Sequence, residues 1–162
     1  MTAQADHYEE DFIGWTEEQA RFLREEAARG TNLPLDWANL AEEVEGLGRS
    51  ELRALESQVH RLILHLLKLE FSSARDPRAG WVDSVDDARI RILRHLRQDP
   101  GLKPRLPGVI ADAEADAVRQ AMRELRRHGE DPAGIVGRRD AGAIYSADQI
   151  LGDWLPERPD LS

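Results

Sequence analysis

The feature that most constrains this chain is one long helical segment, residues 50–71, which reads SELRALESQVHRLILHLLKLEF. At about 100° per residue, apolar residues spaced alternately three and four apart share one helix face. That stripe consists of Leu52, Leu55, Val59, Leu62, Leu66 and Leu69. Ile63, Leu64 and Leu67 widen it beyond half of the circumference. A helix that is apolar on nearly all sides is buried among several partners.

The apolar run within this segment is too short to cross a membrane, because the charged residues Arg61, Lys68 and Glu70 limit its length. We therefore expect it to form the buried centre of an antiparallel helical bundle. The chain shows no strand-like alternation and no internal repeat, so the predicted fold class is all-α with no sheet. With 162 residues, we expect a single domain over residues 8–156, with flexible termini at 1–7 and 157–162.

Two helices are predicted before the central segment, and the sequence does not determine where the first of them begins. The first helix begins either near Asp11 or at Thr16, whose side chain forms a possible capping box with Gln19, and the sequence leaves both open. Asp36 is a good N-cap for a second helix. Its apolar stripe is formed by Leu40, Val44 and Leu47.

Two glycines separate this second helix from the central segment. Gly46 and Gly48 flank Leu47, and the next apolar residue in line, Leu52, comes five residues later, which breaks the helical register. A bend or tight turn at Gly48 is the simplest explanation. One long helix with a stutter over residues 36–71 remains possible.

The second half of the chain predicts two further long helices and one short helix. The first begins with Ser84 and ends before Asp99, and the second runs from Pro107 to the region of Gly129. Residues 130–143, rich in Gly, Asp and Arg, are expected to be an irregular loop. Ser146 and Gln149 form a capping box for the short helix.

Composition limits the partners and the location. The net charge of -9 disfavours nucleic-acid binding. The second half of the chain is nevertheless rich in arginine, whereas the acidic excess lies in residues 6–51. The chain has no cysteine, which excludes disulfides and thiolate chemistry. We predict no membrane segment and no signal peptide, and therefore expect a cytoplasmic protein.

Known catalytic motifs are missing from the sequence, which has no phosphate-binding loop, no HExxH and no GxSxG. This favours a non-enzymatic protein. The most suggestive polar pair is Glu56 with His60, which are one helical turn apart inside the apolar arc, and Glu43 could approach them. We favour a hydrogen-bonded structural pair over an acid–base or ligand site. The spacing differs from the Glu-x-x-His of bundle metal sites, so we predict no metal and no cofactor.

A second polar pair, His65 with Lys68, forms the narrow strip opposite the apolar face of the central segment. A solvated strip on an otherwise buried helix is the favoured interpretation. Ligand binding by this pair is the alternative. The candidate ligand-binding residues are therefore Glu43, Glu56, His60, His65 and Lys68.

Five segments of the chain also carry a family resemblance. In order, they are YEEDFIGWTEEQARFLR, DWANLAEEVEGLGRSELRALESQ, LILHLLKLEF, DPGLKPRLP and IYSADQILGDWLPE. Together they resemble the bacterial family called domain of unknown function 29, from Tyr8 to Pro156. The resemblance implies an all-helical fold and no established activity. Its matching positions include Asp11, Phe12, Trp15, Asp36, Asn39, Leu40, Glu42, Glu43, Gly48, Ser50, Glu51, His65, Leu66, Leu67, Lys68, Trp81 and Pro104.

Two segments depart from the family pattern, residues 76–80 and 128–130. No role is therefore carried over to them from the resemblance.

Three hypotheses about function follow. The first is a protein-interaction or structural module that acts as a homo-oligomer or binds an unidentified protein, because catalytic motifs are lacking and the two halves carry opposite charge. The second is a metal- or small-ligand-binding helical-bundle enzyme that uses the Glu and His residues. The third is an antitoxin-like or nucleic-acid-associated module that uses the arginines.

Overall fold

The computed structural model describes residues 3–157, with side chains from His7 onward, and within that range it is all-α with no strand. The helices are α1 (Ala3–Glu10), α2 (Phe12–Ala28), α3 (Trp37–Phe71), α4 (Arg78–Gln98), α5 (Leu106–Arg127), α6 (Ala133–Asp140) and α7 (Ala147–Leu151). A 3₁₀-helix, η1 (Pro100–Leu102), joins α4 to α5. The all-α prediction is confirmed. No helix among the described residues is long and apolar enough to span a membrane.

The chain divides into two compact units. Unit 1 comprises the described residues up to Ala54, together with His95–Arg105. Unit 2 comprises Leu55–Arg94 and the chain from Leu106 onward. The long helices α3 and α4 contribute residues to both units. The expectation of a single domain over residues 8–156 stays a prediction.

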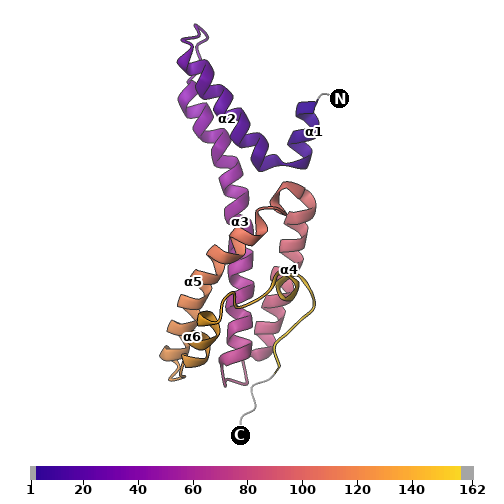
Figure 1. Cartoon of the computed structure of the whole chain (residues 1–162), viewed down its shortest axis with the longest axis vertical. Helices are drawn as coiled ribbons and strands as arrows, with labels where there is room; N and C mark the ends of the chain where they lie inside the picture. The colour runs from indigo at the N-terminus through magenta and orange to yellow at the C-terminus, as the bar shows by residue number, and fades with distance from the viewer. Residues whose placement is uncertain (1–2, 158–162) are drawn as a thin grey trace. The chain divides into compact units, whose positions relative to one another are not determined.

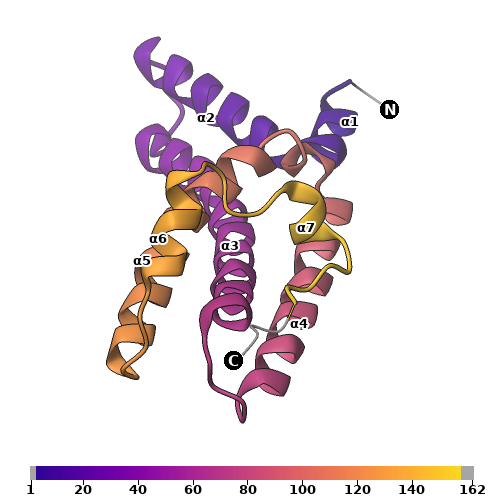
Figure 2. The same cartoon turned by 60° about the horizontal axis from the view of Figure 1, so that its bottom comes forward.

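Unit 2 is built around the second half of α3, with α4 and α5 lying along it (Figures 1 and 2). Six apolar side chains of this half are completely shielded from solvent: Leu55, Val59, Leu62, Ile63, Leu66 and Leu67. Burying one such side chain stabilises a fold by roughly 1.5–3 kcal/mol. The prediction of a buried central helix is confirmed. From α5, Ala113, Ala117 and Ala121 are buried, and these small residues permit close helix packing.

Unit 1 pairs α2 with the first half of α3, and the two helices run antiparallel (Figure 1). Helix α2 begins near Asp11, whose Oδ1 accepts a hydrogen bond from the Gly14 amide at 2.9 Å. The alternative start at Thr16 is wrong, because Thr16 is a buried helix residue whose hydroxyl donates to the Ile13 carbonyl. Asp36 caps α3 as predicted, and its Oδ1 accepts from the Asn39 amide at 3.2 Å.

The favoured break at Gly48 is wrong, because α3 is one continuous helix. A Cβ atom at Gly48 would lie 2.2 Å from Thr16 Oγ1 on α2. The glycine therefore allows a close helix crossing and makes no turn, since positive φ angles occur only at other glycines in the described chain.

Two further helix assignments in the structure differ from the prediction. Helix α4 begins at Arg78 and not at Ser84, whose hydroxyl instead donates to the Gly80 carbonyl one turn earlier. The predicted loop 130–143 contains α6, which buries Ile135 and brings Gly134 against Phe71, where a Cβ would meet the ring at 2.8 Å. The capping box of Ser146 and Gln149 is confirmed at the start of α7.

The structure describes only part of the two termini that the sequence predicts to be flexible. Residues 3–7 belong to α1, a helix that the sequence pattern does not predict. Residues 1–2 and 158–162 lie outside the described range.

Candidate functional site

The predicted site residues fall into two sets. Glu43 belongs to unit 1 and is exposed, whereas Glu56, His60, His65 and Lys68 belong to unit 2. Within the described residues, no hydrogen bond or ion pair joins Glu56 to His60 or to Glu43. The favoured structural pairing of Glu56 with His60 is therefore not formed.

The residues around Lys68 form a polar cluster within unit 2. The Lys68 ammonium pairs with Glu124 of α5 and lies 5.7 Å from the centre of the Trp81 ring of α4. Gln120 Nε2 donates to the other oxygen of Glu124 at 2.9 Å. Burial raises the pKa of Glu124, but the hydrogen bonds from Lys68 and Gln120 outweigh it and leave the pKa below its usual value. The cluster ties α3 to both α4 and α5.

His65 completes this polar cluster as a neutral side chain. Burial, followed by the charges of Lys68 and Arg61, lowers the pKa of His65 to about 4. Its Nδ1 atom is buried and has no hydrogen-bond partner among the described residues. The favoured interpretation of a solvated strip is wrong, because neither His65 nor Lys68 is exposed. Ligand binding by this pair stays a prediction.

The first half of α3 carries the predicted apolar stripe, and two of its three residues are exposed, whereas Val44 is only partly exposed. Leu40 is 39% exposed and Leu47 is 54% exposed. Seven residues make almost two full turns, so both lie on one face, with Glu43 between them. We call Leu40, Glu43 and Leu47 the α3 strip. The helix instead packs through small residues, since Ala41 and Gly48 are buried.

A second exposed apolar surface lies on α4 in unit 2. Ile90 is 57% exposed and Leu93 is 41% exposed. Arg94 follows one turn after Ile90 on the same face, and within the described chain it makes no ion pair. Ile90, Leu93 and Arg94 are the α4 strip.

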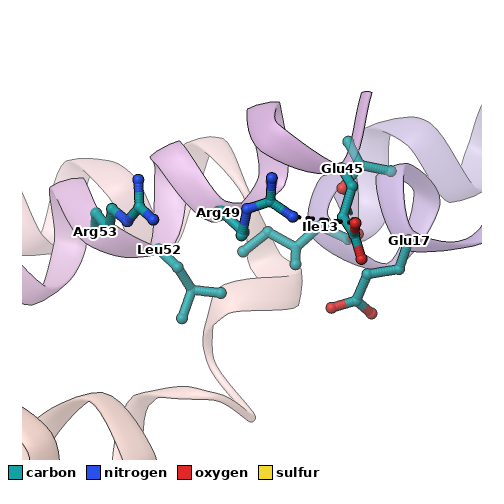
Figure 3. A pocket seen from close by; sticks show the side chains of 8 residues that line it. Ile13, Glu17, Glu45, Arg49, Leu52 and Arg53 are labelled. Carbon is teal, nitrogen blue, oxygen red and sulfur yellow. Dashed lines mark hydrogen bonds and ion pairs between the residues drawn. The ribbon is translucent and has the colours of Figure 1, made fainter. Parts of the chain in front are cut away.

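Unit 1 also contains a pocket of about 250 Å³ between α2 and α3 (Figure 3). Ile13 and Leu52 provide apolar surface, and Arg49 bridges to Glu45 at 3.0 Å. The Arg24 hydrogen bond holds the pKa of Glu45 below its usual value. Arg49 is therefore neutralised by Glu45, whereas Arg53, which also lines the pocket, has no ion pair among the described residues.

Comparison with known proteins identifies the family. The model described as domain of unknown function DUF29 matches residues 7–153. The chain belongs to the DUF29 family. A similar solved structure is a crystal structure of an α-helical protein of unknown function from Rhodospirillum rubrum. It is 29% identical, with a TM-score of 0.66, over 90% of this chain and 89% of that chain. No match was found among curated proteins.

The fold of this DUF29 chain also joins polar residues that the sequence pattern does not connect. Tyr145 donates to Glu70 at 2.7 Å, and Arg138 pairs with the other oxygen of that carboxylate. Burial raises the pKa of the Tyr145 hydroxyl, so the tyrosine stays protonated. In the sequence, Glu70 marks only the end of the apolar run, because a charged residue at a helix end gives no signal of a partner 75 positions later.

Among the described residues, no three His, Asp or Glu side chains are grouped as a metal site requires. The arrangement described above provides ion pairs, a neutral imidazole and two exposed apolar strips.

Proposed function

We propose that this DUF29 protein is an interaction module that associates with a second copy of itself through the α3 strip. The observation that carries the proposal is the exposure of Leu40 and Leu47 on one face of a long helix. Exposed apolar side chains that repeat along a helix are typical of helix-docking surfaces. Leu33 and Leu35, in the loop before α3, add further exposed apolar side chains to unit 1.

The occupant proposed for the α3 strip is the α4 strip of another copy. Each strip has two exposed apolar side chains at helical spacing. Each also has one charged residue without an ion pair among the described residues, which is Glu43 on α3 and Arg94 on α4. Apolar burial would supply affinity, and the opposite charges would set the register. This complementarity favours a second copy over an unrelated partner.

Sedimentation velocity over a range of concentrations tests the proposal. The wild-type chain is expected to populate species larger than the monomer. Leu47→Glu should weaken association at least about tenfold, because it places a charge in an apolar contact. Ile90→Glu should act in the same way from the other surface.

A matched control comes from α6, where Val136 is exposed and lies in neither strip. Val136→Glu should leave association unchanged. Wild-type protein that stays monomeric at every concentration, or equal weakening by Val136→Glu, would contradict the proposal.

A further inference from the structure

A second pocket in unit 1 has a different character from the first. It measures about 230 Å³ and is lined by Tyr8, Glu9, Phe12, Glu51, Gln98 and Asp99. Three of the six residues are carboxylates, two are aromatic, and none is Lys or Arg. The pocket is therefore a negatively charged hollow next to aromatic rings.

Asp99 is the lining residue that points to a ligand, because it is only 7% exposed and half of its carboxylate is unused. Its Oδ1 accepts from the amides of Phe12, at 3.3 Å, and Gly101, at 3.0 Å. Its Oδ2 is buried and has no hydrogen-bond partner in the described part of the chain. A buried carboxylate oxygen without a donor is costly, so a hydrogen-bond donor is what this position lacks.

The neighbouring cations do not supply that donor. Arg105 lies in the same unit, but its guanidinium is held by Asp11 at 3.0 Å and by the Gly101 carbonyl at 2.8 Å. His95 approaches Glu51, with 3.8 Å between Nδ1 and Oε2. Two of the three lining carboxylates, Glu9 and Asp99, have no ion pair within residues 7–157.

The aromatic rings next to the pocket form a cluster. The Tyr8 ring meets Phe12 edge-on at 5.4 Å and meets Trp15 edge-on at 4.8 Å, measured between ring centres. Ring faces attract organic cations, and carboxylates beside them add charge and hydrogen-bond acceptors. The combination is the one that proteins use for ammonium groups.

We infer that this pocket binds a small organic cation of the alkylammonium class. Its N–H groups would donate to Asp99 and Glu51, and its alkyl part would lie against Tyr8 and Phe12. The volume is below the roughly 300–1,000 Å³ of sites for drug-sized ligands, so the cation should be small. A metal ion fits less well, because the carboxylates are not grouped as a metal requires among the described residues. None of the α3-strip residues lines the pocket, so this inference does not depend on self-association.

Titration of the 162-residue chain with n-butylammonium chloride, followed by ¹H–¹⁵N NMR, tests the inference. The amides of Phe12 and Gly101 both donate to Asp99, so they report on the site itself. We expect saturable shifts of these two signals, with a Kd of about 1 mM, as is usual for so small a ligand. Sodium chloride at equal ionic strength and 1-butanol should produce no saturable shift there.

Two variants make the test specific. Asp99→Asn keeps the shape of the side chain and an acceptor for the two amides, and should weaken binding about tenfold or more, because it removes the charge. Glu51→Gln should weaken it as well, and decides the matter if Asp99→Asn does not fold. Glu25→Gln, which removes an exposed charge on α2 that pairs with Arg21, should have no effect.

Several results would overturn the inference. These are the absence of saturable shifts with n-butylammonium, equal shifts with 1-butanol, or undiminished binding by folded Asp99→Asn or Glu51→Gln. Saturation of the same signals by magnesium chloride in place of the ammonium salt would also overturn it. The reporting amides of Phe12 and Gly101 donate to Asp99 and belong to neither strip, so their response to the ammonium salt is read separately from the oligomeric state.

Discussion

At two residues, a change of a single atom or of a single proton is expected to alter the stability of the fold. The first residue is Gly48. A Cβ there would lie 2.2 Å from Thr16 Oγ1, and Thr16 is itself fixed by its hydrogen bond to the Ile13 carbonyl. Gly48→Ala is therefore expected to lower the free energy of unfolding by about 1–2 kcal/mol, because the clash exceeds the gain in helix propensity.

Gly46 provides the matched control, since a Cβ added there would meet only the end of the flexible Arg49 side chain, at 3.7 Å. Gly46→Ala should raise the free energy of unfolding by up to about 1 kcal/mol. Urea denaturation measures both. A stabilising effect of Gly48→Ala would contradict the close crossing of α2 and α3.

His65 is the second such position, and it should make stability depend on pH. Its pKa is about 4 in the folded protein and 6.5 in the unfolded chain, so the unfolded chain binds more protons between these values. Stability should therefore fall as the pH decreases from 6.5 to 4. His65→Gln removes this titration.

The difference in unfolding free energy between wild type and His65→Gln should shift by an amount on the order of 1–3 kcal/mol across that pH range. Urea denaturation at several pH values, on both proteins, gives this difference. A constant difference would show that the imidazole titrates normally in the fold.

Among the elements, the short helix α7 lies beside α4 (Figure 2). It depends on one buried side chain of α4, that of Arg89. Arg89 donates to the carbonyls of Gln149, Ile150 and Trp154, which end and follow α7. Arg89→Met keeps the bulk of the side chain but leaves these carbonyls without a donor. We expect a loss of about 3 kcal/mol and faster proteolysis after Tyr145.

The control for that prediction is Arg91→Met. Arg91 is exposed and, among the described residues, pairs only with Asp87, at 3.0 Å, so its loss should cost less than about 0.5 kcal/mol. Limited proteolysis and urea denaturation compare the two variants. Equal effects would show that Arg89 does not hold the C-terminal segment.

How far the sequence predicts these elements depends on whether local residues determine them. The stripe from Leu52 to Leu69 predicts the buried half of α3, and the Ser146 capping box predicts the start of α7, because both signals lie within a few residues. Helix α6 escapes prediction because one of its two glycines, Gly134, packs against Phe71, which lies far away in sequence.

The same reasoning applies to the candidate sites. The family pattern singles out His65, Lys68 and Trp81, but Glu124, the ion-pair partner of Lys68, becomes visible only in the fold. Nor does the spacing of Leu40 and Leu47 reveal that these residues are exposed, because an apolar stripe has the same sequence pattern whether it faces the core or a partner.

At the scale of the whole molecule, the central claim is that two copies associate through oppositely charged strips. Glu43→Arg should weaken association about three- to tenfold, because it would oppose Arg94 of the other copy. Arg94→Glu should do the same. Neither residue makes an ion pair within the described part of its own chain, so both variants should fold normally.

The measurement that tests this claim most directly is the dissociation constant of the double variant Glu43→Arg/Arg94→Glu, obtained by sedimentation equilibrium. The two swapped charges face each other again in the proposed contact. The dissociation constant of the double variant should therefore recover to within about twofold of the wild-type value. A double variant as weak as the product of the two single effects, or a wild-type chain that never associates, would contradict the claim.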